Sequence, residues 1–427
     1  MHQIAILGAG YVGLTTAACF AKLGLTVAVS DVNVKRIDLL NEGICPIVED
    51  GLPKLIMEGI ASKRLSFISD NLQAVSDADF VFLCLPTPQG VDGVADTSFV
   101  EGATKQIASH LKSGAVVVTK STVPVGSAAV IQNALNRPDI AVVSNPEFLR
   151  EGSAIHDFLH PDRIVIGSNS AEAAQMVSDL YKILGAKIII TDPASAETIK
   201  YAANAFLATK ISFINAVAAV CEGVGADVLD VIEGVGSDTR IGEAFLKPGP
   251  GWGGSCFPKD TKALVKIAEN AGYDFALLRG VVEVNEQQLE RIVGKILTIR
   301  PTSTTDFRVC ALGLTFKAGT DDRRDSPAIS IIHRLLALGI EVHAYDPTVS
   351  KGPHADDLDG IVLHESAEEA AQNADAIIVL TEWPEFKSLD PINVGKFVRS
   401  KNIVDARNLL DADLWRASGF AHVGVGR

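Results

Sequence analysis

The sequence lacks an excess of basic residues, a long apolar run and any recognisable targeting segment. Its 52 acidic and 38 basic side chains give a formal net charge of −14, which argues against a nucleic acid or an anionic membrane as partner. No apolar run reaches the roughly 18 residues of a membrane span, and no basic and apolar leader stands at the start. These absences favour a cytoplasmic protein.

Metal-binding spacings of cysteine and histidine are missing as well. Only His156 and His160 stand one helical turn apart, and Pro161 follows them without a third ligand. A reducing compartment suits all the cysteines as thiols. The six are scattered along the chain: Cys19, Cys45, Cys84, Cys221, Cys256 and Cys310. We therefore expect neither a metal site nor a disulfide framework.

Alternating strand and helix patterns dominate what is present, in a chain that is 47% apolar. Residues 3–7 predict a strand, residues 14–23 a helix and residues 26–30 a second strand, which together form a βαβ unit. Helices are expected between most of the later strands, so the pattern predicts a parallel, doubly wound sheet. These further strands are predicted at 65–69, 79–85, 115–119, 140–144 and 163–167.

The rest of the chain changes character and then partly repeats the opening. Residues 195–233 have helical spacing and no proline, which predicts a long helix between two domains with an apolar face for a partner helix. Residues 258–298 are helical in pattern too. A second strand–helix–strand pattern over 308–346 ends at Asp346, as the first ends at Asp31, and strands at 375–380 and 402–405 extend it. The fold class predicted is α/β, with two Rossmann-like doubly wound domains bridged by a long central helix and a helical segment.

A glycine-rich turn marks the first candidate site. The run Gly8-Ala9-Gly10-Tyr11-Val12-Gly13 follows a strand and opens a helix, and Asp31 ends the next strand. Gly8 permits the turn, Gly10 lets a pyrophosphate approach the helix N-terminus, and Gly13 lets helix and strand pack closely. Asp31 suits ribose hydroxyls and repels a 2′-phosphate, so NAD is favoured over NADP, and Arg36 could cover the adenine or counter nearby charge. The alternative is a glycine-rich turn with a capping aspartate and no ligand. The second repeat lacks the glycine run and should hold its ligand differently.

Two threonines follow the ends of the predicted fourth and fifth strands. Ligands of open α/β sheets bind at the carboxyl ends of the strands, so Thr87 and Thr122 are candidates for the nicotinamide side. The alternative is that both are ordinary turn residues.

Residues 245–261, FLKPGPGWGGSCFPKDT, carry the candidate nucleophile. Cys256 stands just before a helix that Pro258 helps to start, where the helix dipole and Lys259 both favour a thiolate. The alternative is a buried structural cysteine.

Further polar residues are candidates for acid–base or oxyanion roles. Lys200 and Asn204 share one face of the long helix at i and i+4. Glu147 and Glu151 follow a strand, and either could serve as a general base if burial brings its pKa toward neutrality. The alternatives are a solvated helix stripe and surface charge.

Together these segments resemble the UDP-glucose/GDP-mannose dehydrogenase family over nearly the full length. The motifs that carry the resemblance are GAGYVG, PTP, KSTVP, NPEFLREG, KYAANAFLATK, GWGGSCFPKD, FKAGTDDRRDSP and VDARN. The resemblance implies an NAD-binding Rossmann domain at 1–195, a central helical dimerisation region at 196–300 and a C-terminal UDP-sugar-binding Rossmann-like domain at 301–427. It implies a homodimer or higher homo-oligomer that oxidises UDP-glucose to UDP-glucuronate with two NAD. The alternatives are GDP-mannose or a UDP-N-acetylhexosamine as substrate, and a sensor without turnover.

The resemblance also implies residue roles. Cys256 would form a thiohemiacetal and then a thioester, Lys200 and Asn204 would stabilise the oxyanion, and Glu147 would be the acid/base, with Asp260 and Thr122 holding a water. The NAD contacts implied are Gly8, Gly10, Tyr11, Val12, Gly13, Asp31, Arg36, Thr87, Thr122, Glu151, Lys259 and Arg324. The substrate contacts implied are Phe148, Leu149, Glu151, Lys200, Asn204, Arg240 (toward the partner subunit), Phe245, Leu246, Lys247, Gly249, Gly253, Lys317 and Arg407.

Three positions depart from the family pattern. Val48 and Asp50 replace the tyrosine and proline of a YEPGL run, and Pro86 replaces a small or apolar residue before Thr-Pro. All three fall on the predicted cofactor side, and none belongs to the thiol chemistry.

Overall fold

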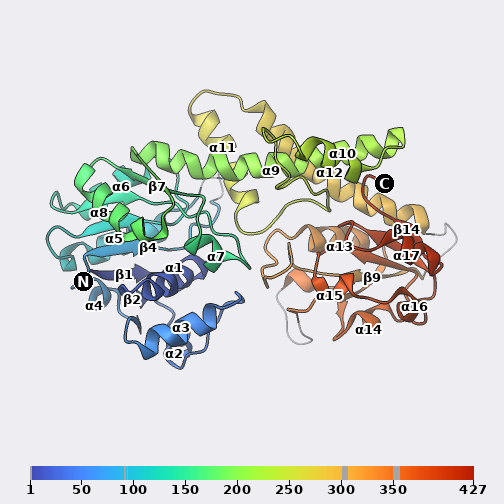
Figure 1. Cartoon of the computed structure of the whole chain (residues 1–427), viewed down its shortest axis with the longest axis horizontal. Coiled ribbons are helices and arrows are strands. Elements are labelled where there is room, and N and C mark those ends of the chain that lie inside the picture. Colours follow the sequence, from blue (N-terminus) through green and yellow to red (C-terminus); the bar gives the residue numbers. More distant parts are fainter. Residues whose placement is uncertain (1, 91–92, 94, 301–305, 350–355) are drawn as a thin grey trace. The chain divides into compact units, whose positions relative to one another are not determined.

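A computed structural model describes residues 2–90, 93, 95–300, 306–349 and 356–427. The predicted start of the C-terminal domain, residue 301, lies outside these residues. The chain forms two compact units, the first from residues 1–203 and 262–271 and the second from residues 204–261 and 272–427. It passes from one to the other within α9 (Pro193–Val224), within α11 (Phe257–Asn270) and again just after α11, between residues 271 and 272 (Figure 1).

The first unit is built on an eight-stranded sheet in the order β3-β2-β1-β4-β5-β6-β7-β8. The predicted doubly wound α/β fold is confirmed, with one exception to parallel pairing: β6 and β7 are antiparallel, so β7 and β8 run against the other strands. The last strand, β8, was not predicted from the sequence. The strands are β1 (Gln3–Leu7), β2 (Thr26–Ser30), β3 (Leu65–Ile68), β4 (Phe80–Leu83), β5 (Val116–Thr119), β6 (Ala141–Ser144), β7 (Arg163–Ser168) and β8 (Lys187–Thr191).

Alternation along β1 explains why helices cover both faces of this sheet. Ile4 and Ile6 join a core cluster with α1 and α3, whereas Ala5 and Leu7 join a second cluster with α5 and α6. A strand that is apolar on both faces needs a helical layer on each. The helices of this unit are α1 (Tyr11–Lys22), α2 (Val34–Asn41), α3 (Leu52–Ala61), α4 (Asn71–Val75), α5 (Ser98–Ile107), α6 (Ser127–Leu135), α7 (Ala154–Leu159) and α8 (Ala171–Tyr181), with short 3₁₀ turns at Ala108–His110 and Lys182–Leu184.

The predicted helix over 195–233 is two helices. α9 ends at Val224 because Gly225 adopts a left-handed φ of 76°, and α10 (Val228–Gly236) begins anew with its first turn capped by the Asp227 side chain. Residues 258–298 likewise divide at Gly272, with a φ of 78°, into α11 and α12 (Ala276–Ile299).

Among the described residues, α9 alone is long and apolar enough to cross a membrane, with a mean hydropathy of 1.4 over its most apolar window. In that window 44% of the residues are buried, and the helix also carries a buried ion pair from Lys200 to Glu147. Helices of globular folds meet the same criterion of length and composition, so this property alone does not indicate a membrane span.

The second unit is built on a six-stranded parallel sheet in the order β11-β10-β9-β12-β13-β14. Counted from its first strand, this order is the same as that of the first six strands of the other sheet, and it is the Rossmann order. β11 and β14 were not predicted from the sequence. The strands are β9 (Arg308–Leu312), β10 (Glu341–Tyr345), β11 (Ile361–Leu363), β12 (Ala376–Val379), β13 (Asn402–Asp405) and β14 (Ala421–Val423). The helices are α13 (Pro327–Ala337), α14 (Ala367–Ala371), α15 (Pro384–Lys387), α16 (Pro391–Val394) and α17 (Ala412–Ala417), with a 3₁₀ turn at Asp356–Leu358.

Candidate active site

The three glycines between β1 and α1 differ in what surrounds them. A Cβ at Gly8, whose φ is 103°, would lie 2.3 Å from the carbonyl oxygen of Cys84, and a Cβ at Gly13 would lie 1.9 Å from that of Gly8. A Cβ at Gly10 would meet nothing within 4 Å. Gly8 and Gly13 are thus required by packing, whereas Gly10 borders open space at the N-terminus of α1.

The surroundings of this turn fit an NAD molecule. α1 begins at Tyr11 with no side chain capping its first turn, which leaves the positive end of the helix available to a pyrophosphate. Asp31 follows β2, and its Oδ2 accepts the amide of Ala9 at 2.8 Å and Arg36 Nη1 at 3.3 Å. Among the described residues, its Oδ1 accepts only the amide of Asn33, at 2.8 Å, so the carboxylate keeps a lone pair for a ribose hydroxyl, and the predicted arrangement of turn, helix end and acid is present in the fold.

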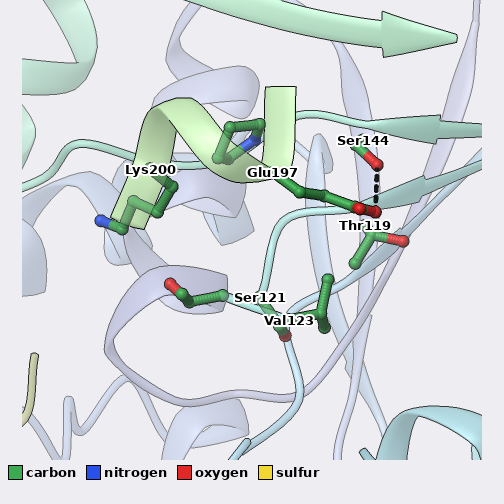
Figure 2. A pocket seen from close by; sticks show the side chains of 8 residues that line it. Thr119, Ser121, Val123, Ser144, Glu197 and Lys200 are labelled. Carbon is green, nitrogen blue, oxygen red and sulfur yellow. Dashed lines mark hydrogen bonds between the residues drawn. The ribbon is translucent and has the colours of Figure 1, made fainter. Parts of the chain in front are cut away.

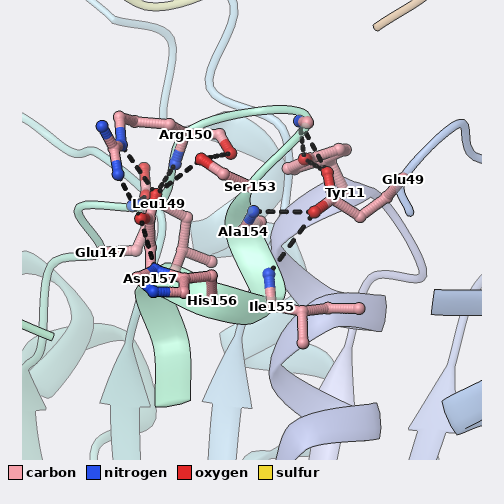
Figure 3. A network of polar contacts seen from close by, with 11 residues as sticks. Tyr11, Glu49, Glu147, Leu149, Arg150, Ser153, Ala154, Ile155, His156 and Asp157 are labelled. Carbon is pink, nitrogen blue, oxygen red and sulfur yellow. Dashed lines mark hydrogen bonds and ion pairs between the residues drawn. The ribbon is translucent and has the colours of Figure 1, made fainter. Parts of the chain in front are cut away.

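Glu49 was not singled out in the sequence, yet it ties the glycine-rich turn to a second loop (Figure 3). Its buried carboxylate accepts the Tyr11 hydroxyl and the amides of Gly152 at 2.6 Å and Ala154 at 2.7 Å. Burial is the largest cause that raises the pKa of Tyr11, so its hydroxyl stays protonated and donates. The neighbours of Glu49 that depart from the family pattern, Val48 and Asp50, are both exposed, so neither disturbs this network.

The two candidate threonines are joined by a hydrogen bond. Thr87 Oγ1 donates to the carbonyl oxygen of Thr122 at 2.8 Å, which links the loop after β4 to the loop after β5. Thr122 also lines a small cavity with room for about one water molecule (Figure 2). Its lining is formed by Thr119, Ser121, Thr122, Val123, Ser144, Pro146, Glu197 and Lys200.

Lys200 and Glu147 form a buried ion pair. The Lys200 Nζ lies 2.9 Å from Glu147 Oε1 and 2.7 Å from the Glu147 carbonyl oxygen, and both side chains are at most 7% exposed. The other carboxylate oxygen of Glu147 accepts the amide of Leu149 at 2.6 Å. Next to this pair, the Arg163 guanidinium lies 3.6 Å from the ring centre of Phe148, so the whole NPEFL loop is fixed by charged contacts.

A second buried carboxylate, Glu197, precedes Lys200 by one turn of α9 and was also missed in the sequence. It accepts the amides of Gly126 at 2.6 Å and Ala128 at 3.0 Å and the Ser144 hydroxyl at 3.0 Å. These contacts satisfy the first turn of α6 from outside that helix. In the sequence, Glu197 could be recognised only as an acid on the same helix face as Lys200. Nothing in the sequence identified the groups that it binds.

Asn204 belongs to another buried polar chain. Its Nδ2 donates to Asp260 Oδ2 at 2.6 Å, and Lys259 Nζ lies 2.6 Å from Asp260 Oδ1. The Asp260 side chain is completely buried. Cys256 directly precedes α11, and its carbonyl oxygen accepts the amide of Asp260, so the thiol stands at the N-terminus of that helix next to the Ser255 hydroxyl at 3.6 Å.

The glycine-rich loop before Cys256 is packed tightly within its own unit. A Cβ at Gly253 would lie 2.0 Å from the carbonyl oxygen of Asp325, and one at Gly249 would lie 3.3 Å from Arg407 Nη1. Arg407 also donates to the carbonyl oxygens of Leu380 and Phe316, at 2.8 and 2.9 Å. At the start of the loop, Phe245 has a φ of 64°, a left-handed conformation that is strained for a residue of its size. Such strain is typical of ligand-binding loops.

The remaining residues that were predicted to contact a ligand do not belong to the polar clusters around Glu147 and Asp260. Arg240 is paired with Asp238 at 2.6 Å and its side chain is 86% exposed, and Arg324 is paired with Asp322 at 2.7 Å. Lys247 is exposed, and Lys317 Nζ lies 5.6 Å from the Phe316 ring centre. Leu246 is buried, and Glu151 is half-buried. In the described part of the chain, no group of histidine, cysteine and carboxylate side chains is arranged to hold a metal ion.

The second sheet has its own aspartate after the second strand, but that side chain is saturated. Asp346 is 1% exposed and accepts hydrogen bonds from backbone amides, hydroxyls and an indole. Its donors are the amides of Leu314, Thr315 and Thr348, the hydroxyls of Thr315 and Thr348, and Trp383 Nε1. It therefore cannot receive ribose hydroxyls as Asp31 can, which agrees with the prediction that this domain holds its ligand differently.

Comparison with known proteins gives the same division of roles. The NAD binding domain of the UDP-glucose/GDP-mannose dehydrogenase family matches residues 2–185, its central domain matches residues 194–287, and its UDP binding domain matches residues 310–412. The UDP-glucose 6-dehydrogenase TuaD of Bacillus subtilis is 44% identical over 100% of this chain and 94% of its own. Among solved structures, a UDP-glucose dehydrogenase from Pyrobaculum islandicum superposes with a TM-score of 0.91 at 36% identity, covering 100% of this chain and 98% of its own. A UDP-D-ManNAc dehydrogenase from Pyrococcus horikoshii gives 0.88 at 30% identity, covering 100% and 99%. The chain belongs to the UDP-glucose/GDP-mannose dehydrogenase family.

Proposed function

We propose that the chain is an NAD-dependent UDP-glucose 6-dehydrogenase, which converts UDP-glucose, two NAD⁺ and water into UDP-glucuronate and two NADH. The observation that carries this proposal is the thiol of Cys256 at the N-terminus of α11, followed by the buried Lys259–Asp260–Asn204 chain. An alcohol oxidation alone needs no such thiol, whereas oxidation of the resulting aldehyde first needs a covalent adduct. Full-length relatives that are 42–44% identical and named UDP-glucose 6-dehydrogenases support the same reaction.

The first unit is proposed to hold the cofactor. When bound, NAD supplies the acceptor for one hydride in each of two oxidations. The open position at Gly10 and the uncapped first turn of α1 would receive its pyrophosphate, and Asp31 its ribose. Tyr11, Val12, Arg36, Thr87, Thr122, Glu151, Lys259 and Arg324 complete the proposed cofactor set.

Cys256 is proposed as the nucleophile of the second stage. Its thiolate attacks the aldehyde carbon at C6 of the sugar and gives a thiohemiacetal whose oxygen carries the developing negative charge. Loss of hydride from this carbon leaves a thioester, and water then adds to the thioester carbon, releasing the carboxylate and restoring the thiol. The N-terminal end of α11 and the Lys259 ammonium both favour the thiolate form.

Lys200, Asn204 and Glu147 are proposed to serve the oxygen at C6. The Lys200 ammonium and the Asn204 amide are donors one turn apart on α9, suited to an oxyanion, and loss of one such donor typically costs about 2.7–4 kcal/mol of transition-state stabilisation. Glu147, which is paired with Lys200, is the proposed acid/base, with Thr122 and Asp260 positioning a water.

The second unit is proposed to bind the UDP part of the substrate. The proposed contacts are Phe245, Leu246, Lys247, Gly249, Gly253, Lys317 and Arg407, with Phe148, Leu149 and Glu151 from the other unit. The glycine-rich backbone from Gly249 to Gly253 suits close approach of a sugar, and Arg407, which is fixed by the carbonyl oxygen of Leu380 and by Glu382 at 3.1 Å, supplies a guanidinium. With this assignment, we propose that the chain is divided into three functional domains, with boundaries at residues 195 and 300.

A homodimer in the cytoplasm is the proposed working form. Four exposed apolar side chains lie on one face of α9, with exposed fractions between 56% and 72%: Phe206, Phe213, Val220 and Val224. Their spacing of seven, seven and four residues keeps them in one stripe, which suits packing against the same helix of a second copy. Arg240, exposed apart from its contact with Asp238, is the proposed contact with the partner's substrate.

The decisive measurement is the number of NADH molecules formed per UDP-glucose consumed. Two supports the full oxidation to the acid, whereas one rejects it. Parallel assays with GDP-mannose and with UDP-N-acetylmannosamine, the sugar nucleotide named for the Pyrococcus horikoshii structure, test the alternative substrates. A higher kcat/KM with any of these than with UDP-glucose would reject the proposed specificity.

Cys256→Ser tests the covalent stage. We expect this variant to bind UDP-glucose but to release no acid, because an alcohol does not form a comparable adduct at neutral pH. Cys45→Ser, at another half-buried thiol, is the matched control and should keep full activity. Free UDP-glucuronate produced by Cys256→Ser at close to the parent rate would contradict the proposed mechanism.

A further inference from the structure

Lys120 is a buried cation that the proposed chemistry does not use. It follows β5, is 4% exposed, and lies at the base of the loop that carries Thr122. Its Nζ is 3.1 Å from Asn145 Oδ1 and 3.4 Å from the Tyr181 hydroxyl, both of which are neutral groups. Within the described residues, no carboxylate lies within ion-pair distance of it.

Such a charge is unfavourable for folding. A buried ammonium without a counter-ion loses its hydration and gains only dipoles in return. Burial is the main cause that lowers the pKa of Lys120 to about 8, while Cys84 and Glu147 act to raise it and Lys200 to lower it. Cys84 and Tyr181 are themselves held neutral, since burial raises the pKa of Cys84 to about 12 and that of Tyr181 well above its usual value.

The contacts of Lys120 connect the two loops on which the proposed chemistry of this unit depends. Asn145 Oδ1 accepts from Lys120 and from the Tyr181 hydroxyl at 2.7 Å, and Asn145 Nδ2 donates to the carbonyl oxygen of Val165 at 2.8 Å. Asn145 therefore has a single fixed orientation. Glu147 follows it by two residues, so the position of that carboxylate depends on the same contacts.

We propose that Lys120 is a positioning residue for the oxidation, which fixes the loop carrying Glu147 and holds a positive charge near the buried Lys200–Glu147 pair. It acts through Glu147 and does not touch the substrate. With Lys200, it places two positive charges in the part of this unit that carries Glu147, which favours a developing oxyanion beside Lys200. The effect of Lys120 on the oxidation rests on the proposed function. Its effect on folding stability does not, because that effect concerns the protein alone.

Lys120→Met removes the charge and keeps the side-chain length. We expect kcat to fall by about tenfold or more, because the loop that carries Glu147 loses one of its fixed contacts, and we expect the acid limb of the pH profile to move upward by about half a pH unit, because a buried positive charge is removed from the site. We expect resistance to urea at pH 7 to be equal to or higher than that of the parent, because an unpaired buried charge is gone. A residue that served packing alone would show neither the shifted pH limb nor the retained stability.

The stability of the parent should also depend on pH in a defined direction. Folded Lys120 loses its proton near pH 8, while in the unfolded chain a lysine keeps it to about 10.5. Between these values the unfolded chain binds more protons, so the free energy of unfolding rises with pH. At each pH, the free energy of unfolding of Lys120→Met is subtracted from that of the parent. This difference should rise with pH, because the contributions of the other titrating groups are the same in both proteins and cancel.

Two further variants complete the experiment. Lys120→Gln keeps a donor for Asn145 but removes the charge, and it should shift the pH limb as Lys120→Met does. Lys105→Met, at an exposed lysine of α5, should change neither activity nor stability.

The proposal is overturned if both Lys120 variants keep the kcat and pH profile of the parent, or if both lose stability or fail to fold. If the parent does not oxidise UDP-glucose at all, the proposed function fails. The comparison of unfolding across pH still tests the buried cation in that case, and the absence of the rise would overturn it.

Discussion

Single atoms decide what the glycine-rich turn after β1 can do. Gly8 and Gly13 are surrounded by backbone, with hypothetical Cβ contacts of 2.3 and 1.9 Å, whereas Gly10 faces open space. Two of the three glycines therefore serve folding, and one leaves room for a ligand. Glycine is therefore required in this motif for two different physical reasons, packing and ligand access, and a substitution at each position can separate them.

Gly13→Ala and Gly10→Ala form a matched pair for this purpose. We expect Gly13→Ala to lower the free energy of unfolding by about 3 kcal/mol or more, because α1 must move away from the turn. Gly10→Ala should change that free energy by less than about 1 kcal/mol but weaken NAD binding by about tenfold or more. Urea unfolding and NAD titration by fluorescence measure the two effects. NAD affinity equal to the parent in Gly10→Ala would mean that the pyrophosphate binds elsewhere.

Individual residues could be predicted from the sequence where their signal is local. Gly10, Asp31 and the i, i+4 pair of Lys200 and Asn204 stand at fixed distances from a strand or on one helix face. Glu49 and Glu197 could not be found in this way, because their partners are 103 and 71 residues away in the chain. A lone carboxylate is usually a surface charge, and only the fold brings the orphan amides to it.

At the level of elements, the Glu197 side chain anchors the N-terminal part of α9 and also provides hydrogen-bond acceptors for the first turn of α6. Glu197 satisfies amides of the first turn of α6, whose own cap position is Gly126 and offers no side chain. The same contact fixes the turn of α9 that carries Lys200. Burial raises the pKa of Glu197, so these hydrogen bonds offset a desolvation penalty.

Glu197→Ala should therefore act on two helices at once. We expect the free energy of unfolding to fall by about 2–4 kcal/mol, because two amides and the Ser144 hydroxyl lose their acceptor. We expect kcat to fall as well, because Lys200 loses its support. Chemical denaturation measures the first effect and the NADH assay the second. Glu172→Ala, at an exposed acid of α8, is the control, and equal stability of the two variants would contradict the anchoring role.

The elements that the sequence did not predict share a physical property. β8, β11 and β14 lie at or near the edges of their sheets, and their burial patterns mix half-buried and exposed residues, so they lack the continuous apolar runs of the central strands. The helix break at Gly225 was missed because the apolar spacing continues beyond it from α9 into α10. Central strands and helix types were predictable, while edges and breaks depend on backbone conformation.

For the whole molecule, the two sheets share the order of six strands but differ in how the aspartate after the second strand is engaged. Each first strand is followed by a glycine with a left-handed φ, 103° at Gly8 and 99° at Gly313, and each second strand is followed by an aspartate. Asp31 retains accepting capacity, whereas Asp346 is fully engaged by its own domain. The repeat was visible in the sequence, but the saturation of Asp346 was not, since Trp383 reaches it from 37 residues away.

The apolar stripe on α9 gives a prediction about assembly. Phe213 is 56% exposed at the middle of the stripe, and burying such side chains against a second copy would supply the main driving force for association. Phe213→Glu should therefore convert the proposed dimer into a monomer at micromolar concentration without unfolding either sheet. Sedimentation velocity measures the mass, and circular dichroism the fold. Phe99→Glu, which places the same charge at an exposed phenylalanine of α5, should remain dimeric. A Phe213→Glu protein that sediments as the parent does would show that this face of α9 is not the interface.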